Sequence, residues 1–159
     1  MFKEKFNLVE LVMSLETSLG MLTKRSDSKI KFNIAAKKIN IESDKAKISQ
    51  VIYNFVDNAV KYGAKNQTIE VNISLPNEKS VRVEVKGNGQ GIVKDMQKKL
   101  FLKFSQLEPS LSRSQDGMGL GLYICKQNID NLGGSIGVES EVNKGATFFF
   151  TLPLKTSKI

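Results

Sequence analysis

The order of the expected helices and strands is the feature that most limits how this chain can fold. Hydrophobic periodicity and turn signals predict, in chain order, a helix near 8–24, strands at 30–35 and 39–41, a helix from Ser43 or Asp44 to Tyr62, strands at 68–75 and 80–85 around Pro76 and Asn77, a helix at 120–132, and a hairpin of strands at 135–142 and 147–154. Strands that come in hairpins between helices are typical of an α+β two-layer sandwich, whereas a doubly wound fold needs strict alternation. We therefore expect one sheet with helices covering one face.

The chain is expected to form a single domain over 1–159. It has 159 residues, which suits one hydrophobic core, and no Pro- or Ser-rich linker divides it. A stretch at about 94–116 shows at most short helices. Irregular stretches of this length usually have a function, commonly as a lid over a binding site.

Composition excludes several kinds of chemistry. The chain has no histidine and one cysteine, Cys125, so it can hold no Ser-His-Asp or Cys-His catalytic group, no four-ligand zinc site and no internal disulfide. The lone cysteine favours a reducing compartment, and without a signal peptide or a long apolar stretch we expect a cytoplasmic domain with no direct membrane contact. The formal net charge is +8, but the lysines are scattered, which argues against nucleic-acid binding.

The second expected helix carries an unusual polar stripe. At roughly 100° per residue, Lys47, Gln50, Asn54, Asn58 and Lys61 fall on one side, opposite the apolar residues. Asparagine is a poorer helix former than the charged residues that usually cover a solvated face. Two amide oxygens one turn apart could hold a hydrated cation such as Mg²⁺. The alternative is an exposed face that happens to contain asparagine, and the stripe alone leaves both interpretations open.

Six of the twelve glycines form two alternating clusters, at Gly87, Gly89 and Gly91 and at Gly117, Gly119 and Gly121. Alternating glycines let a ligand approach the backbone closely. The second cluster directly precedes a helix, whose free N–H groups and dipole favour phosphate. One such pattern can be a tight turn, but two that flank a long loop indicate a phosphate-containing ligand.

Five motifs together resemble the ATP-binding catalytic domain of sensor histidine kinases. They are, in the family's order, the N box Asn54-Phe-Val-Asp-Asn58-Ala-Val-Lys61-Tyr62, the first glycine box Gly87-Asn-Gly89-Gln-Gly91-Ile92, the F box Leu100-Phe101-Leu-Lys-Phe104, the second glycine box Gly117-Met118-Gly119-Leu120-Gly121-Leu122 and the closing motif Lys144-Gly145-Ala-Thr147-Phe148. The resemblance implies a Bergerat-type fold, which is a mixed, mostly antiparallel sheet covered by about three helices. Gyrase, HSP90 and MutL ATPases share this fold, but the F box and the lid favour the kinases.

The resemblance implies a role for each residue of the N box and the glycine boxes. Asn58, helped by Asn54, would hold Mg²⁺ at the triphosphate of ATP. Lys61 would contact phosphate, and Tyr62 would lie beside the nucleoside. The first glycine box would border the nucleotide, and the backbone N–H groups of 117–122 would bind its phosphates.

Further roles follow for the lid and the closing motif. Arg113 is expected to bind the γ-phosphate, because a guanidinium binds phosphate bidentately, and Gln115 is a second candidate. Phe104 would lie at the nucleotide, whereas Phe101 is expected to anchor the base of the lid in the core. Thr147 would place a hydroxyl near adenine.

The chain departs from the family at Gly87, where the family has an aspartate that accepts a hydrogen bond from the adenine amino group. Losing such a buried charged partner costs on the order of 1–3 kcal/mol. An engineered substitution, a degenerate domain and an altered base preference would each explain Gly87. Because the remaining motifs are intact, we expect a competent site with weakened adenine binding, in which Gly87→Asp would tighten binding of an ATP analogue.

The expected function is that of a protein-histidine kinase catalytic domain in two-component signalling. It would bind Mg-ATP and donate the γ-phosphate to a histidine on a separate dimerisation domain, which is absent from this sequence, and through it act on a response regulator. The isolated domain is expected to be monomeric, and its parent kinase could be membrane-anchored. The alternatives are a pseudokinase or docking module without phosphotransfer, and an ATPase of the same fold with Asp57 as the carboxylate nearest the N box.

Overall fold

A computed structural model describes residues 2–89, 91–102 and 121–154 of the chain. Its helices and strands follow each other as β1 (Glu4–Asn7), α1 (Leu8–Ser14), α2 (Glu16–Thr23), the 3-10 turn η1 (Lys24–Ser26), β2 (Lys29–Ile34), β3 (Asn40–Ser43), α3 (Lys45–Tyr62), β4 (Thr68–Asn77), β5 (Ser80–Gly87), α4 (Lys94–Gln97), α6 (Gly121–Asn131), β6 (Ser135–Ser140) and β7 (Ala146–Pro153). No helix among the described residues is long and apolar enough to cross a bilayer.

Five strands form one mixed sheet in the order β2-β4-β5-β7-β6. β2 runs parallel to β4, and the other neighbouring pairs are antiparallel. A separate two-stranded ribbon joins β1 to β3. The expected α+β class with a mixed, mostly antiparallel sheet is therefore confirmed.

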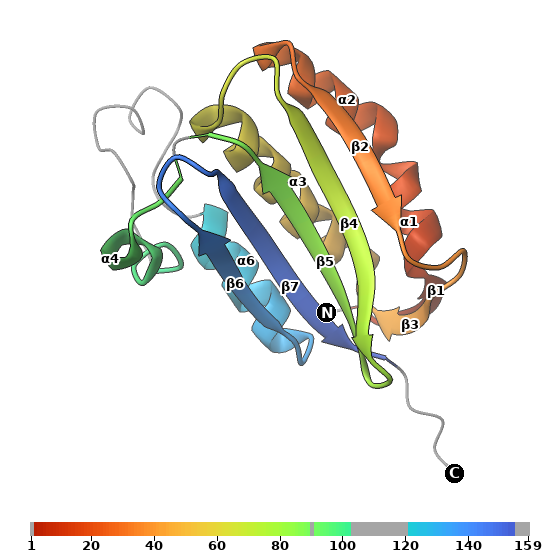
Figure 1. The fold of residues 1–159 in the computed structure, drawn as a ribbon. Helices are drawn as coiled ribbons and strands as arrows, with labels where there is room; N and C mark the ends of the chain where they lie inside the picture. The colour runs from red at the N-terminus through yellow and green to blue at the C-terminus, as the bar shows by residue number, and fades with distance from the viewer. Residues whose placement is uncertain (1, 90, 103–120, 155–159) are drawn as a thin grey trace.

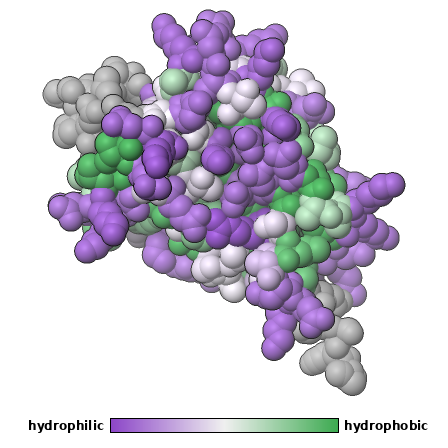
Figure 2. Space-filling view, in the orientation of Figure 1, coloured by the Kyte–Doolittle hydropathy of each residue, from purple (hydrophilic) through white to green (hydrophobic). Residues whose placement is uncertain are grey.

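The helices cover one face of this sheet (Figure 1), where α2 contacts β2, α3 contacts β5 and α6 contacts β6. The core lies between the two layers and is centred on Phe55 of α3, whose ring lies 5.5 Å from that of Phe148 and 6.2 Å from that of Phe150. The opposite face is largely hydrophilic in Figure 2. There Asn72 of β4 accepts a hydrogen bond from Asn33 of β2 at 2.7 Å and donates one to Glu84 of β5 at 3.2 Å. These two hydrogen bonds link three neighbouring strands.

Two expected boundaries differ from the structure. The single helix expected near 8–24 is divided at Leu15, which caps α1 and precedes α2. Because Leu8, Val12 and Leu19 stay buried on the same side, the apolar pattern continues across the break and cannot reveal it. Pro76 and Asn77 lie inside β4 rather than in the turn, which Glu78 and Lys79 form instead.

Candidate functional site

Helix α3 positions the polar stripe because the N-terminal end and the apolar side of the helix are both held in place. Asp44 caps its N-terminus and accepts a hydrogen bond from the Lys47 N–H at 3.1 Å. Its apolar side is fully buried at Ile48, Val51, Ile52, Phe55 and Val56. The stripe therefore faces away from the sheet core, and its last turns end at a pocket.

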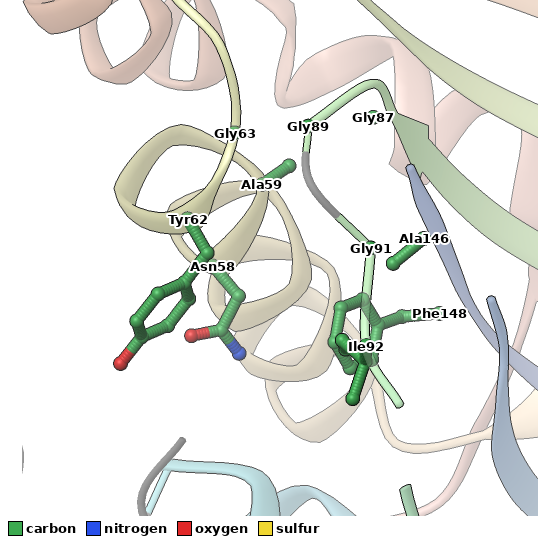
Figure 3. A pocket seen from close by; sticks show the side chains of 10 residues that line it. All are labelled: Asn58, Ala59, Tyr62, Gly63, Gly87, Gly89, Gly91, Ile92, Ala146 and Phe148. Carbon is green, nitrogen blue, oxygen red and sulfur yellow. The ribbon is translucent and has the colours of Figure 1, made fainter. Parts of the chain in front are cut away.

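That pocket lies where the C-terminal end of α3, the turn after β5 and the first residues of β7 meet (Figure 3). The residues that line it are Asn58, Ala59, Tyr62, Gly63, Gly87, Gly89, Gly91, Ile92, Ala146 and Phe148. The pocket together with the open solvent at its mouth spans about 500 Å³. Among the described residues, Asn58 and Tyr62 supply its polar side chains, and both point to the same side in Figure 3. The pocket thus combines a largely apolar wall with an amide and a phenol at one edge.

Two glycines let the turn after β5 lie directly on the end of α3. A Cβ atom on Gly89 would come within 2.8 Å of the Gly63 Cα and of the Tyr62 carbonyl oxygen. Gly63 and Gly89 form an isolated antiparallel bridge, and the Ala64 N–H donates to the Asn88 carbonyl at 3.1 Å. A side chain at Gly89 would therefore separate the two walls of the pocket, so this glycine of the first cluster is explained by close backbone approach.

The β6–β7 hairpin holds the other end of this turn. The Ile92 N–H donates to Ser140 Oγ at 2.8 Å, and Ser140 Oγ donates to the Gly145 carbonyl at 2.7 Å. Gln97 Nε2 donates to the Ile92 carbonyl at 2.7 Å and to the Ser140 carbonyl at 3.1 Å. Ser140 and Gln97 therefore fix the glycine turn. Sequence analysis missed both, because a polar residue with distant partners leaves no periodic signal.

Gln67 is a third positioning residue that sequence analysis missed. Its side chain is 4% exposed, and Nε2 donates to the Ala59 carbonyl at 3.0 Å. Its Oε1 accepts from the Asn88 N–H at 2.7 Å. One carboxamide thus ties the last turns of α3 to the turn after β5, beneath the pocket wall.

Asn54 lies against the start of α6. Its Nδ2 donates to the Gln50 carbonyl at 3.0 Å, and its Oδ1 would lie 3.1 Å from a Cβ atom on Gly121. Gln50 in turn accepts from the buried Asn128 of α6 at 3.0 Å. The two helices are therefore joined by amides, and the end of the second glycine cluster meets the N-box helix at Asn54.

Cys125, on the buried side of α6, is a structural residue. Burial raises the pKa of its thiol to about 12, although a hydrogen bond with the Asn54 side chain acts in the opposite direction. The thiol is therefore neutral at physiological pH and is no candidate nucleophile.

Lys61 forms an ion pair with Asp57, one turn earlier on α3, with 3.1 Å between Nζ and the carboxylate. Both side chains are about one-fifth exposed, at 20% and 19%. Asp57 does not line the pocket. Lys61 does not line the pocket either, and Asp57 is placed to hold the Lys61 side chain.

Thr147 does not line the pocket, and neither do the expected site residues Asn54, Lys61, Gly121 and Leu122. Ala146 and Phe148 line it instead, and successive strand residues point to opposite faces, so Thr147 of β7 points to the other side of the sheet. The sequence carries a signal for this orientation: Phe148 and Phe150 are two residues apart and both buried, so Ala146, two residues earlier, lies on their side of the strand.

Several expected site residues lie outside the described residues. They are Phe104, Arg113, Gln115, Gly117, Met118, Gly119 and Leu120. Of the expected lid at about 94–116, only 94–102 is described. It contains α4 and the F-box residues Leu100, which is buried, and Phe101, which packs on the core. Leu122, after the second glycine box, is also partly buried against the core.

The residues present suit a cation that is coordinated mainly by water and by the phosphates of a bound molecule. Asn54 and Asn58 carry neutral amide oxygens on the polar side of α3, a donor type that Mg²⁺ accepts together with water and phosphate. Among the described residues, no three Asp, Glu or Cys side chains form a metal-binding group. Any Mg²⁺ at this edge would therefore take few protein ligands from the described part of the chain.

Comparison with known proteins agrees with this geometry. Residues 43–156 match the family of histidine kinase-, DNA gyrase B- and HSP90-like ATPases. The signal transduction histidine-protein kinase ArlS of Staphylococcus haemolyticus is 36% identical over 145 residues, which is 91% of this chain and 31% of the relative. ArlS of Staphylococcus aureus (strain USA300) is 39% identical over 116 residues, 73% of this chain and 26% of the relative. The chain thus spans about a third or less of the length of these relatives.

Solved structures show the same fold. The catalytic domain of histidine kinase ThkA superposes with a TM-score of 0.83 at 29% identity, covering 98% of this chain and 100% of that one. Full-length ShkA in complex with AMPPNP has a TM-score of 0.85 at 24% identity, covering 100% and 32%, and supports the fold alone. The chain belongs to the family of histidine kinase-, DNA gyrase B- and HSP90-like ATPases, and among its members it shares sequence and fold with the catalytic domains of histidine kinases.

Proposed function

We propose that this domain binds Mg-ATP in the pocket at the end of α3 and donates the γ-phosphate to a histidine on a separate dimerisation domain. The observation that carries the proposal is the position of Asn58. It lines the pocket beside Tyr62, on the same helix whose Asn54 meets the start of α6. One helix thus connects an apolar pocket suited to a base with a helix N-terminus suited to phosphate.

In this proposal the base lies among Ala59, Ile92 and Phe148, which line the pocket. Tyr62 lies beside the nucleoside, and Asn58 and Lys61 lie toward the triphosphate. The backbone N–H groups of 117–122 and the Arg113 guanidinium complete the phosphate site. Mg²⁺, held by Asn58 with help from Asn54, neutralises charge on the phosphates when it is bound.

Phosphoryl transfer depends mainly on positioning and electrostatic stabilisation. The γ-phosphoryl group leaves the β-phosphate oxygen of ATP and bonds to an imidazole nitrogen, while ADP departs. The acceptor must come from another chain or domain, because the sequence contains no histidine. The group that accepts the imidazole proton also belongs to that partner, so we assign no general base here.

Gly87 should weaken the hold on adenine. It lines the pocket without a side chain, so no carboxylate at this position accepts a hydrogen bond from the base. Binding is expected to be weaker by a margin on the order of 1–3 kcal/mol than in a site with that carboxylate.

The proposed partners follow from the relatives. ThkA, 27% identical to this chain at a TM-score of 0.79, has been solved in complex with the response regulator TrrA, and the superposition covers 96% of this chain and 42% of that one. By analogy, we place this domain in a sensor kinase that acts through a histidine-containing dimerisation domain on a response regulator. The isolated domain would be a cytoplasmic monomer, and its parent kinase could be membrane-anchored.

Two alternatives remain distinct from this proposal. A docking module or pseudokinase would bind nucleotide weakly because of Gly87, and it would transfer no phosphoryl group. An ATPase would need a carboxylate that activates water beside the triphosphate, and Asp57, which is paired with Lys61 and does not line the pocket, is the candidate nearest the N box.

The proposal is tested by mixing the domain with γ-labelled ATP, Mg²⁺ and a helical domain that carries a phosphoacceptor histidine. We expect acid-labile label on that helical domain. Asn58→Ala should abolish it, whereas Asn131→Ala, an exposed asparagine of α6, should not. Binding of nucleotide without any transfer would support the docking module instead, and release of free phosphate without an acceptor would support the ATPase.

A further inference from the structure

The space beside Gly87 is already occupied by another side chain. A Cβ atom on Gly87 would lie 3.2 Å from Gln67 Oε1 and 3.3 Å from the Ala59 Cβ. Gln67 comes from the segment between α3 and β4, twenty positions earlier in the chain. Its carboxamide therefore lies against the first side-chain atom that a residue at position 87 would carry.

Hydrogen bonds hold the Gln67 side chain in this place. It is 4% exposed, and both ends of its amide are used, toward the Ala59 carbonyl at 3.0 Å and from the Asn88 N–H at 2.7 Å. A Cβ atom on Gly63 would also clash with Gln67 Nε2. Three residues that touch or flank the amide, namely Ala59, Gly63 and Gly87, line the pocket. Gln67 is thus part of the layer immediately behind the pocket wall.

We propose that Gln67 and Gly87 form a matched pair that determines what this end of the nucleotide pocket offers the base. The Gln67 carboxamide takes the volume of the side chain missing at position 87, and it leaves the wall uncharged. This proposal rests on the proposed function only in naming the ligand as a nucleotide. Gln67 is a positioning and specificity residue, and it takes no part in phosphoryl transfer.

The pairing predicts that a carboxylate cannot simply be restored at position 87. A Cβ atom 3.2 Å from the Gln67 oxygen and 3.3 Å from the Cβ of the buried Ala59 is in tighter contact than most Cβ atoms, so one of these neighbours must move. A carboxylate there would also face Oε1, which is an acceptor, so neither group could donate to the other. Gly87→Asp alone should therefore displace Gln67 and break its bond with the Asn88 N–H. The tightening expected from Gly87→Asp should occur only when Gln67 is shortened as well.

The test is a double-mutant cycle of the wild-type chain, Gln67→Ala, Gly87→Asp and the double variant. Each protein is titrated calorimetrically with a non-hydrolysable ATP analogue and Mg²⁺, and its melting temperature is measured without nucleotide. We expect Gly87→Asp to bind no more tightly than the wild type and to melt lower. In the Gln67→Ala background the same substitution should tighten binding about tenfold or more and lower the melting temperature less. Gln127→Ala, an exposed glutamine of α6, is the matched control and should leave the effect of Gly87→Asp unchanged.

The outcomes separate this proposal from the proposed function. Equal effects of Gly87→Asp in the two Gln67 backgrounds, whether tightening or weakening, would overturn the pairing. If the wild type bound no nucleotide, the proposed function would fail, and the melting temperatures would still decide whether positions 67 and 87 are coupled. Coupling in the melting temperatures with no change in affinity would overturn the specificity role.

Discussion

Asn58 and Tyr62 stand one turn apart on α3 and give the described part of the pocket its polar side chains. The remaining wall is apolar side chain or glycine backbone. Recognition of a base must therefore depend on shape, stacking and backbone groups more than on charged side chains. In the proposed function, phosphate would be bound beyond this wall, by Lys61 and the start of α6.

Lys61 allows a direct test of this division. We predict that Lys61→Ala weakens binding of an ATP analogue about tenfold, because a charge-assisted contact to phosphate is lost. Adenosine, which has no phosphate, should bind equally to both proteins. Lys126→Ala is the control, since Lys126 forms a similar ion pair with Asp130 at 3.0 Å on α6. Calorimetry that showed the same loss for adenosine would assign Lys61 a structural role.

The placement of a single residue could be predicted where the residue belongs to a repeating pattern. The helical stripe identified Asn54 and Asn58 because their spacing follows the helix. Ala146 lines the pocket and Thr147 does not, because successive residues of a strand point to opposite faces. Gln67 was not predictable at all, because its partners Ala59 and Asn88 lie 8 and 21 positions away.

Helix α3 is the element on which both the core and the site depend. Its N-terminal cap, Asp44, also accepts the Phe2 N–H at 2.8 Å. That hydrogen bond is the main reason the pKa of the Asp44 carboxyl lies below its usual 3.8, while burial opposes the shift and Lys47 reinforces it. Because the pKa is lowered in the folded state, the charged carboxylate stabilises the fold above pH 3.8, and this stabilisation is lost as the pH falls below that value.

We therefore predict two effects at Asp44. Asp44→Ala should lower the free energy of unfolding by about 1 kcal/mol at neutral pH, as expected for loss of a helix cap. Asp44→Asn keeps an oxygen for the cap but no charge, so its deficit relative to the wild type should shrink below pH 3.8. Denaturant titrations across this range measure both effects, with the exposed Asp95→Asn of α4 as control. A deficit for Asp44→Asn that does not depend on pH would refute the assigned role of the charge.

Most elements were predictable, and the exceptions have physical reasons. The ends of α3 and α6 carry local signals, such as the Asp44 cap and Gly133, which has a φ of +83° just after α6. The ribbon strand β1 has four residues, and their partners in Asn40–Ser43 lie 33 to 39 positions away, so no local pattern marks it. Pro76 is accommodated within β4 where the register with β5 shifts, since a residue without an N–H is tolerated at an irregularity.

At the scale of the whole molecule, the order of the elements was enough to predict the α+β class but not the full pairing. Hairpins determined the β4–β5 and β6–β7 pairs, because short turns join them. The parallel pairing of β2 with β4 and the central placement of β5 beside β7 connect strands far apart in sequence. The pairing of β5 with β7 sets Gly87 opposite Ala146 and so brings the glycine turn to the start of β7, where the pocket lies.

The central claim is that this pocket binds ATP together with Mg²⁺ through the amide side of α3. Calorimetric titration of the wild-type domain with a non-hydrolysable ATP analogue, in Mg²⁺ and again in excess EDTA, tests it most directly. We predict one-site binding in Mg²⁺ that weakens about tenfold or more in EDTA, and an Asn58→Ala variant whose affinity no longer depends on Mg²⁺. Absence of binding in Mg²⁺, or an Asn58→Ala variant indistinguishable from the wild type in both buffers, would contradict the account.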